Sequence, residues 1–497
     1  MNSEKINNYD ENSLRQMISD LESVEEEQLN DAVCDIIDIG NRPISFLIDA
    51  LPEMSDKVGK TVVQKLEDFF YFNPEKGEEL VELLKKSVRK VPKPYRAGLL
   101  SALSDILESI DETGEIISDM NEEAMEVLLS NTDITRIGKA IDILVRAKEA
   151  SSIPHIINLM IKNIDRLDKF ENYQFIENSL LALKRLGGEA VLRLLINPIS
   201  DSAIKQLRVE WRTKEQKLLD DTLIALQKLD SDFAQVMIKV IDLSEFNLPF
   251  AAMLNEGIKH SDKWVRQAAV EAMRKTSEEM TPEALSRMLA DPAPEVRLMA
   301  ITSLGAFDKN QTGDLLLDLA SREDEAIDIR LNALYALYSQ GNLSALQQLG
   351  ADKSNEKISI NAKGLASLLM SHELGLHNIL DVYTSANEAY LPEIAHYLSE
   401  LAIPEDIGTM VSVHSKGNEE KRDRMIRFLK AFIEKNDGPR LEAAMKSQLN
   451  EAERSALMRL LPEKKNDSEH KNNDGVGECC ECGHEHHHHH HHKHHHH

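Results

Sequence analysis

The chain has 497 residues, of which 42% are hydrophobic, 29% are charged and only 5% are aromatic. Glycine and proline are scarce, at 21 and 15 residues, so the composition favours amphipathic helices over a β-rich fold. The formal net charge of -27 repels phosphate backbones and anionic lipid, which argues against a nucleic-acid-binding or membrane-surface protein.

The N-terminal part of the chain predicts helices without a targeting segment. The start, MNSEKINNYDENSLRQ, has no basic stretch followed by an apolar one, so no secretory signal is expected. No apolar run approaches the roughly 20 residues that a membrane-spanning helix needs. We expect residues 1–28 to form an N-terminal capping helix region. Cys34 is the only cysteine before the C-terminal tail and offers no disulfide framework, which fits a reduced, cytoplasmic compartment.

One helical pattern recurs along the body of the chain. The segment WVRQAAVEAM, 264–273, places mostly small apolar residues at offsets 0, 3, 4, 7 and 8 from Val265, which is one face of an α-helix. The same offsets recur from Val296 in EVRLMAITSL and from Ile329 in DIRLNALYAL. Small residues on this face allow a neighbouring helix to approach closely.

Looser copies of the pattern lie upstream and centre on Ala102, Leu144, Ala182 and Ala225. From Ala102 to Ala336 the steps between copies range from 31 to 47 residues, which leaves room for two helices and two short turns. The sequence therefore predicts an all-α protein, an α-solenoid of about ten helical hairpins over residues 29–461.

The segment DPAPEVRLMAITSLGAF, 291–307, resembles the HEAT-repeat family, in particular the short bacterial HEAT-like repeats. In that family an aspartate in the turn between two helices and an arginine early in the second helix form a ladder between successive repeats. The resemblance implies these roles for Asp291 with Arg297 and for Asp324 with Arg330, six residues apart in both pairs. The repeat that carries Arg266 departs from this pattern, because His260 stands six residues before the arginine and the nearest aspartate is Asp262.

The body offers no catalytic constellation. Deoxyhypusine hydroxylase, a HEAT-like di-iron enzyme, relies on several His-Glu pairs, whereas this body has one, His372–Glu373. The most basic run, KQLRVEWRTKEQK at 205–217, is balanced by two glutamates and reads as a solvated helix face. We expect a protein that is not an enzyme and needs no cofactor for catalysis.

The C-terminal part of the chain predicts a disordered linker at 462–476 and a metal-binding tail at 477–497, GECCECGHEHHHHHHHKHHHH. Thiolates and imidazoles together favour transition metals such as Ni or Zn over Mg or Ca. The tail lacks a second CxxC and apolar residues, so we expect a loose chelator of several ions instead of a zinc finger. The candidate ligands are Cys479, Cys480, Cys482, His484, His486, His487, His488, His489, His490, His491, His492, His494, His495, His496 and His497.

Three functions remain open from the sequence. The favoured one is a cytoplasmic solenoid that binds a protein partner and carries a tail that stores or delivers transition-metal ions. The second is a plain assembly scaffold whose histidine tail is dispensable or artificial. The third is an enzyme of the lyase or hydroxylase type on a HEAT-like fold. Nucleic acid and membrane are not expected as partners.

Overall fold

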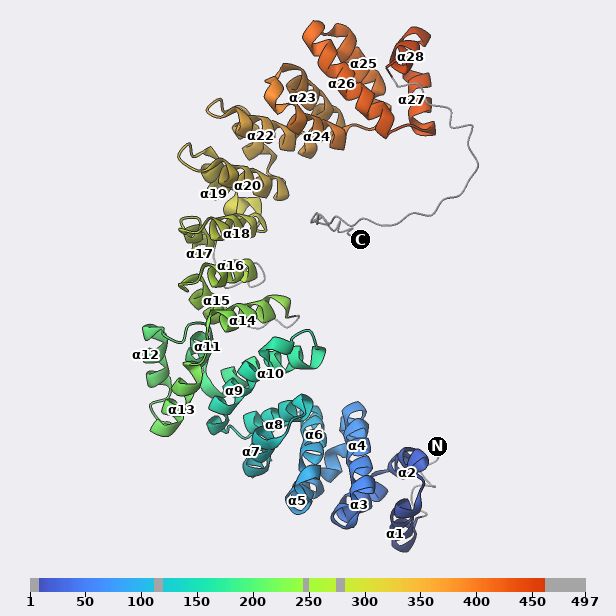
Figure 1. Ribbon diagram of the computed structural model, residues 1–497, viewed down its shortest axis with the longest axis vertical. Helices are drawn as coiled ribbons and strands as arrows, with labels where there is room; N and C mark the ends of the chain where they lie inside the picture. The colour runs from blue at the N-terminus through green and yellow to red at the C-terminus, as the bar shows by residue number, and fades with distance from the viewer. Residues whose placement is uncertain (1–8, 111–118, 245–249, 274–281, 461–497) are drawn as a thin grey trace, which may run out of the picture. The chain divides into compact units, whose positions relative to one another are not determined.

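The computed structural model describes residues 9–110, 119–244, 250–273 and 282–460. Within these ranges the chain forms twenty-eight α-helices and several short 3-10 helices, and it contains no β-strand (Figure 1). The all-α prediction is confirmed. None of the helices in these ranges combines the length and the apolar character that crossing a bilayer requires. The chain divides into two compact units, one ending at Ile379 and the other starting at Leu380, within helix α23 (His372–Ser385).

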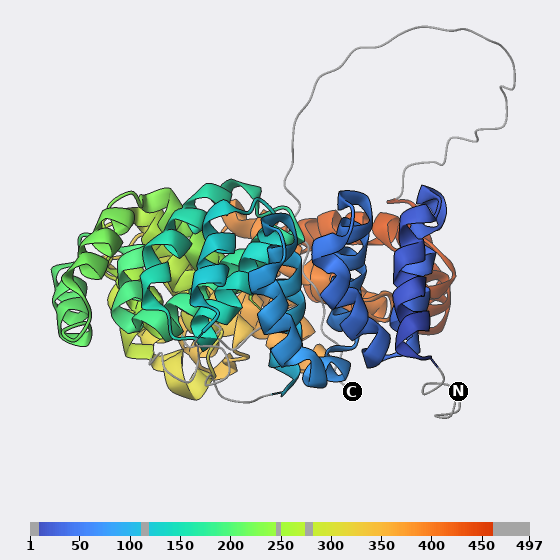
Figure 2. The ribbon, with the colours of Figure 1, turned by 90° about the horizontal axis from the view of Figure 1, so that it is seen from below.

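In the first unit, one row of helices stacks side by side, with each helix packed against the next, and we call it the B row. Figure 2 shows the N-terminal helices of this unit standing next to one another. The B row consists of α2 (Glu26–Ile39), α4 (Asp56–Phe72), α6 (Lys93–Ile110), α8 (Ile134–Arg146), α10 (Phe170–Gly187), α14 (Ser231–Leu243), α16 (Lys263–Ala272), α18 (Pro294–Gly305), α20 (Ile327–Ser339) and α22 (Glu356–Leu369).

The other helices of the first unit form the A row, and most of them pack against the B-row helix of their own hairpin. The A row consists of α1 (Glu11–Asp20), α3 (Asn41–Ala50), α5 (Val81–Lys90), α7 (Asn121–Ser130), α9 (Ile153–Asn163), α11 (Glu189–Ile196), α15 (Ala251–Ile258), α17 (Pro282–Met288), α19 (Lys309–Ser321) and α21 (Leu343–Gly350). Two stacked rows of paired helices are the α-solenoid that the repeat pattern predicts.

The stack has one insertion, α12 (Asp201–Glu210) and α13 (Gln216–Leu226). Helix α12 packs against α11, α13 packs against α9, and α14 then continues the B row between α10 and α16. The looser sequence copy centred on Ala225 therefore lies on the inserted helix α13, not on the B row. Trp211 anchors the insertion, because its buried indole Nε1 donates to the carbonyl oxygen of Gly187 at 2.7 Å.

The helical pattern of the sequence corresponds to a wide buried arc. In α16, α18 and α20 the residues at offsets 0, 4, 7 and 8 are buried, whereas the residue at offset 3 is half-buried. A further position, offset 5, is also fully buried in all three helices, at Val270, Ile301 and Leu334. A B-row helix contacts its A-row partner and two B-row neighbours, so more than one face of it is covered.

Small residues set the close approach of neighbouring B-row helices. A Cβ on Gly305 of α18 would lie 2.9 Å from the Cβ and 3.1 Å from the Cα of Ala336 in α20. Between α16 and α18, the buried Ser303 hydroxyl donates to the carbonyl oxygen of Val270 at 3.0 Å. Larger side chains at these positions would push the helices apart.

The second unit contains the C-terminal part of α23 and five further helices: α24 (Leu391–Leu401), α25 (Ile407–Lys416), α26 (Glu419–Lys435), α27 (Pro439–Gln448) and α28 (Glu451–Met458). Helix α26 joins its core to α23, since Arg424 is 4% exposed and donates to the carbonyl oxygens of Tyr383 and Ala386. The Tyr383 hydroxyl donates in return to the Arg424 carbonyl oxygen at 3.0 Å, and its ring meets Phe428 edge-on.

Candidate functional site

The predicted metal ligands of the tail, Cys479 to His497, lie outside the described residues. Among residues 9–110, 119–244, 250–273 and 282–460, no group of three or more His, Cys, Asp or Glu side chains is placed to hold a metal ion. The candidate sites described below are therefore sites of contact and charge.

Cys34 and His260 belong to reactive residue types, but their surroundings in the fold give them structural roles. Cys34 is half-buried in α2, and burial raises the pKa of its thiol, so the thiol is protonated at neutral pH. His260 lies in the turn before α16, where its Nδ1 accepts the backbone N–H of Asp262 at 3.0 Å. Burial lowers the pKa of His260, which keeps the imidazole neutral and able to accept this bond.

The structure brings Arg266 of α16 together with Asp291, which precedes α18 in the next hairpin. The Arg266 guanidinium donates to both carboxylate oxygens, at 2.8 Å from Nε and 3.1 Å from Nη2, and both side chains are largely buried. Its Nη1 also donates to the carbonyl oxygens of His260 and Ser261, both at 3.0 Å. This arginine thus fixes its own turn and ties it to the following hairpin.

Arg297 of α18 binds its own turn in the same way. Its Nη1 donates to the carbonyl oxygens of Asp291 at 2.8 Å and Pro292 at 3.4 Å, six and five residues before it. The six-residue spacing therefore serves a backbone carbonyl, which any residue supplies. This explains why His260 can stand where the other repeats have aspartate.

Arg330 and Asp324 are not joined by a side-chain contact in the described part of the chain. Arg330 is 2% exposed and its Nε donates to the carbonyl oxygen of Ala320 at 2.8 Å, whereas Asp324 is exposed in the turn. The charge of Arg330 acts on the next turn instead. The pKa of Asp352 is lowered mainly by hydrogen bonds from Ser354, and Arg330 lowers it further.

Charged side chains also bridge the B row over α6. Arg136 of α8 reaches across α6 to Glu67 of α4, with Nε 3.2 Å from the carboxylate and Nη2 also bonded to it. Lys139 of α8 pairs at 2.5 Å with Asp105 on α6 itself. Burial raises the pKa of Glu67, and Arg136 opposes this change. Gly98 leaves room for the bridge, because a Cβ there would lie 2.8 Å from a Glu67 carboxylate oxygen.

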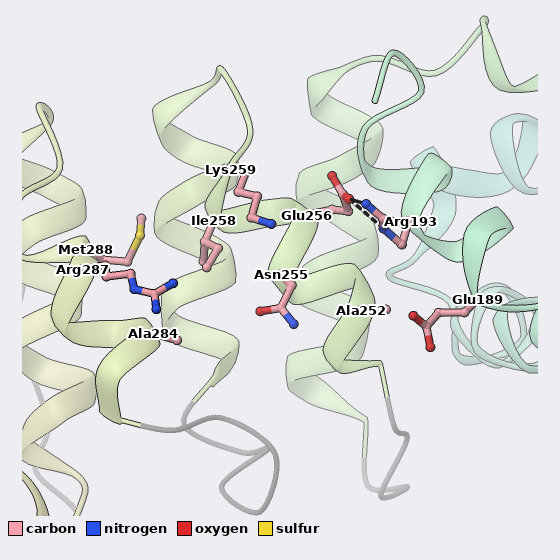
Figure 3. Close-up of a pocket in the computed structure, with 10 residues that line it drawn as sticks. All are labelled: Glu189, Arg193, Ala252, Asn255, Glu256, Ile258, Lys259, Ala284, Arg287 and Met288. Carbon is pink, nitrogen blue, oxygen red and sulfur yellow. Dashed lines mark hydrogen bonds and ion pairs between the residues drawn. The ribbon is translucent and has the colours of Figure 1, made fainter. Parts of the chain in front are cut away.

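A pocket lies on the A row, between α11, α15 and α17 (Figure 3). Its volume is about 490 Å³, which is within the range of small-ligand and side-chain pockets. The lining comprises Glu189, Arg193, Ala252, Asn255, Glu256, Ile258, Lys259, Ala284, Arg287 and Met288. We call it the A-row pocket.

One end of the A-row pocket is fixed by an ion pair between α11 and α15. Arg193 donates through Nε to Glu256 at 2.7 Å, and the two side chains are 18% and 5% exposed. The same guanidinium also donates to Gln206 and Ser202 of the inserted helix α12. At the other end, Lys259 and Arg287 are exposed and have no hydrogen bond or ion pair within the described ranges.

No local sequence pattern marks this pocket. Its charged residues stand on three helices that the fold places side by side, and none of them belongs to a recognisable motif. Only the packing of α11 on α15 shows that Arg193 pairs with Glu256, while Lys259 and Arg287 have no such partner in the described ranges.

Comparison with known proteins agrees with this geometry. Residues 281–362 match a protein-family model described as HEAT repeats. The fold is a HEAT-like solenoid. The HEAT-repeat segment contains α17 to α21 and therefore Asp291, Arg297, Asp324 and Arg330, whereas Arg266 lies before it. No curated protein matches the sequence.

Solved solenoid structures are similar only at a low level. A crystal structure of importin beta has a TM-score of 0.31 at 13% identity, over 90% of this chain and 73% of that chain. Kap95p in a study of its binding to RanGDP has a TM-score of 0.34 at 14% identity, over 92% of this chain and 60% of that chain. A structure of the Pds5–Scc1 complex has a TM-score of 0.27 at 12% identity, over 90% of this chain and 72% of that chain.

Proposed function

We propose that this chain is a non-catalytic protein-binding scaffold whose C-terminal tail chelates transition-metal ions, Ni or Zn foremost, and stores or delivers them near the bound protein. The HEAT-like solenoid is the binding element, and the Cys/His-rich segment from Cys479 to His497 is the chelating element. The proposed compartment is the reduced cytoplasm.

The observation that carries the scaffold function is an apolar face on the B row. Helices α16 and α18 run in the same direction, since Lys263 pairs with Glu295 near their N-terminal ends and Ser303 bonds to Val270 further along. Apolar side chains remain on the outward side of α16, α18 and α20. Trp264 and Tyr335 are each 46% exposed, and Leu298 and Leu331 are half-buried at equivalent positions.

This face has the character of a protein-binding surface. Exposed tryptophan and tyrosine bury a large area at a small cost in side-chain entropy, and they dominate the binding energy of many interfaces. A stack of parallel helices presents such residues at regular intervals, so one extended partner can contact several repeats at once. We call Trp264, Leu298, Leu331 and Tyr335 the B-row face.

The B-row face is tested by truncating its aromatic residues. Proteins captured on the full chain are purified, and their affinities for the unchanged chain and for Trp264→Ala/Tyr335→Ala are compared. We expect binding to weaken at least roughly tenfold, because each aromatic anchor typically contributes above 1 kcal/mol. The matched control is Leu129→Ala/Ile224→Ala, which removes apolar side chains of similar exposure, 59% and 57%, from α7 and α13. Equal loss in both variants, or no loss in the first, would refute the B-row face.

The chelating tail is tested by metal analysis. At pH 7.5 the full chain is expected to bind several Ni or Zn ions, whereas a chain that ends at Pro462 is expected to bind at most one. Imidazole must be neutral to bind metal, so the stoichiometry of the full chain should fall below roughly pH 6.5. Equal stoichiometry with and without the tail would show that the ions bind elsewhere.

A further inference from the structure

We propose that the A-row pocket binds the carboxylate of an acidic side chain, flanked by an apolar residue, in a segment of a partner protein. This inference rests on the proposed scaffold function and gives it a second contact surface, on the opposite helix row from the B-row face. The inference follows from the charges that line the pocket, from its apolar wall and from the contacts that hold one end of it.

The pocket has a positive charge excess in a strongly acidic chain. Its lining has three cations, Arg193, Lys259 and Arg287, against two carboxylates, Glu189 and Glu256, which leaves one net positive charge. The whole chain, in contrast, carries a formal net charge of -27. Because Arg193 is committed to Glu256, the excess resides on Lys259 and Arg287.

These two cations line the pocket and have no anionic partner within the part of the chain that the structure describes. Lys259 follows the last turn of α15, and Arg287 lies in the last turn of α17. Figure 3 shows them on either side of Ile258, with the Asn255 side chain below Lys259. Neither forms a bond to a carboxylate among the described residues, whereas Arg193 in the same pocket is bound to Glu256. Two ammonium or guanidinium groups around one opening are suited to a single anionic group.

The remaining lining selects the kind of anion. The pocket wall between the charges is apolar, formed by Ala252, Ile258, Ala284 and Met288. An aspartate or glutamate side chain brings one negative charge, and an adjacent apolar residue would cover this wall. A phosphate group carries up to two charges and would be repelled more strongly by Glu189, which has no cation paired with it among the described residues.

One end of the pocket is held in place by buried contacts. The ion pair between Arg193 and Glu256 is largely buried and joins α11 to α15, and the contacts of Arg193 with Ser202 and Gln206 add α12 to the same unit. A partner segment that enters the pocket therefore meets helices α11 and α15 already fixed against each other, which lowers the entropic cost of binding.

The test measures the binding of short fluorescent peptides to the full chain by fluorescence anisotropy. The probe is a peptide that alternates Leu-Glu with Gly-Ser, and its matched control has Gln in place of Glu. We expect the Glu peptide to bind at least roughly tenfold more tightly than the Gln peptide, and to weaken as salt rises. Reversing the charges with Lys259→Glu/Arg287→Glu should abolish this preference, whereas Arg212→Glu, at an exposed cation outside the pocket, should leave it unchanged.

Three results of the peptide experiment would overturn the proposal. Equal binding of the two peptides, or a preference that survives the charge reversal, overturns the proposal, as does displacement of the probe by inorganic phosphate at lower concentration than by acetate. If the reversed variant has a lower thermal midpoint than the unchanged chain, Lys259→Gln/Arg287→Gln replaces it in the comparison. The B-row variant Trp264→Ala/Tyr335→Ala should bind the peptide normally, so failure of the pocket and failure of the B-row face are distinguishable.

Discussion

Replacing Asp142 by asparagine is expected to stabilise the protein at neutral pH. Asp142 lies in α8 among the charges that bridge the B row over α6. Burial raises the pKa of its carboxyl from 3.8 to about 6, and Glu108 and Asp105 add to this change while Lys139 and Arg146 oppose it. Ionisation of this carboxyl therefore costs free energy in the folded state but not in the unfolded chain.

Proton linkage determines the sign and the size of the stability change expected for Asp142→Asn. An aspartate with a higher pKa in the folded state binds its proton more tightly there, so its contribution to stability is fully present below about pH 3.8 and is lost as the pH rises through about 6. The difference between these two values corresponds to about 3 kcal/mol. Because the side chain is only half-buried, screening by water reduces the expected gain for Asp142→Asn to about 2 kcal/mol at pH 8.

The assay is thermal or urea unfolding of both proteins, followed by circular dichroism at several pH values between 4.5 and 8. The unfolding midpoint of Asp142→Asn should exceed that of the unchanged chain at pH 8, and the difference should shrink steadily toward pH 4.5. Asp68→Asn, at an exposed position of α4, is the matched control and should shift the free energy of unfolding by no more than about 0.5 kcal/mol. A gain that is absent at pH 8, or equally large at pH 4.5, would refute the reasoning.

Two further predictions concern the packing of the repeats. Gly305→Ala should lower the free energy of unfolding by about 1–3 kcal/mol, because its Cβ would meet the Ala336 backbone at 3.1 Å. Gly138→Ala should raise the free energy of unfolding by about 0.5–1 kcal/mol, because its Cβ has no neighbour nearer than 4.0 Å. Unfolding curves that rank the two variants the other way would contradict the close approach of α18 and α20. Arg266→Ala should cost about 3 kcal/mol because it leaves the buried Asp291 carboxylate unpaired, and Arg266→Ala/Asp291→Asn should recover part of the loss, which a double-mutant cycle measures as non-additivity.

The helical pattern of the sequence predicted the fold because three repeats obey it closely. Offsets from Val265, Val296 and Ile329 identify the residues that are buried at 0, 4, 7 and 8 in α16, α18 and α20. The burial of offset 5 was not predicted, because the pattern describes a single buried face with one neighbouring helix. A B-row helix instead has neighbouring helices on three sides. The insertion of α12 and α13 also escaped it, since α13 is amphipathic in the same way as a B-row helix although it packs against α9.

The arginine contacts illustrate a second limit of sequence reasoning. The resemblance assigned Asp291 and Arg297 to a ladder between successive repeats and marked the repeat of Arg266 as a departure, yet the structure joins the Asp291 carboxylate to Arg266 and the Asp291 carbonyl oxygen to Arg297. Both contacts use the same aspartate and serve different hairpins. A backbone acceptor leaves no trace in the residue type at that position, and a contact between hairpins depends on how the hairpins stack.

The geometry of the B row separates the positions that build the solenoid from those that can bind a partner. Offsets 4, 7 and 8 must remain small or apolar because they are buried, and at offset 7 of α20 a Cβ on Gly305 of α18 would lie only 2.9 Å from the Cβ of Ala336. Offsets 2 and 6 point outward and differ between repeats, from Gln267 to Leu298 at offset 2 of α16 and α18, and from Thr302 to Tyr335 at offset 6 of α18 and α20. A substitution at these outward positions changes the surface without changing the spacing of the helices. A solenoid of this kind can therefore acquire or alter a partner one repeat at a time while its stacking contacts stay the same.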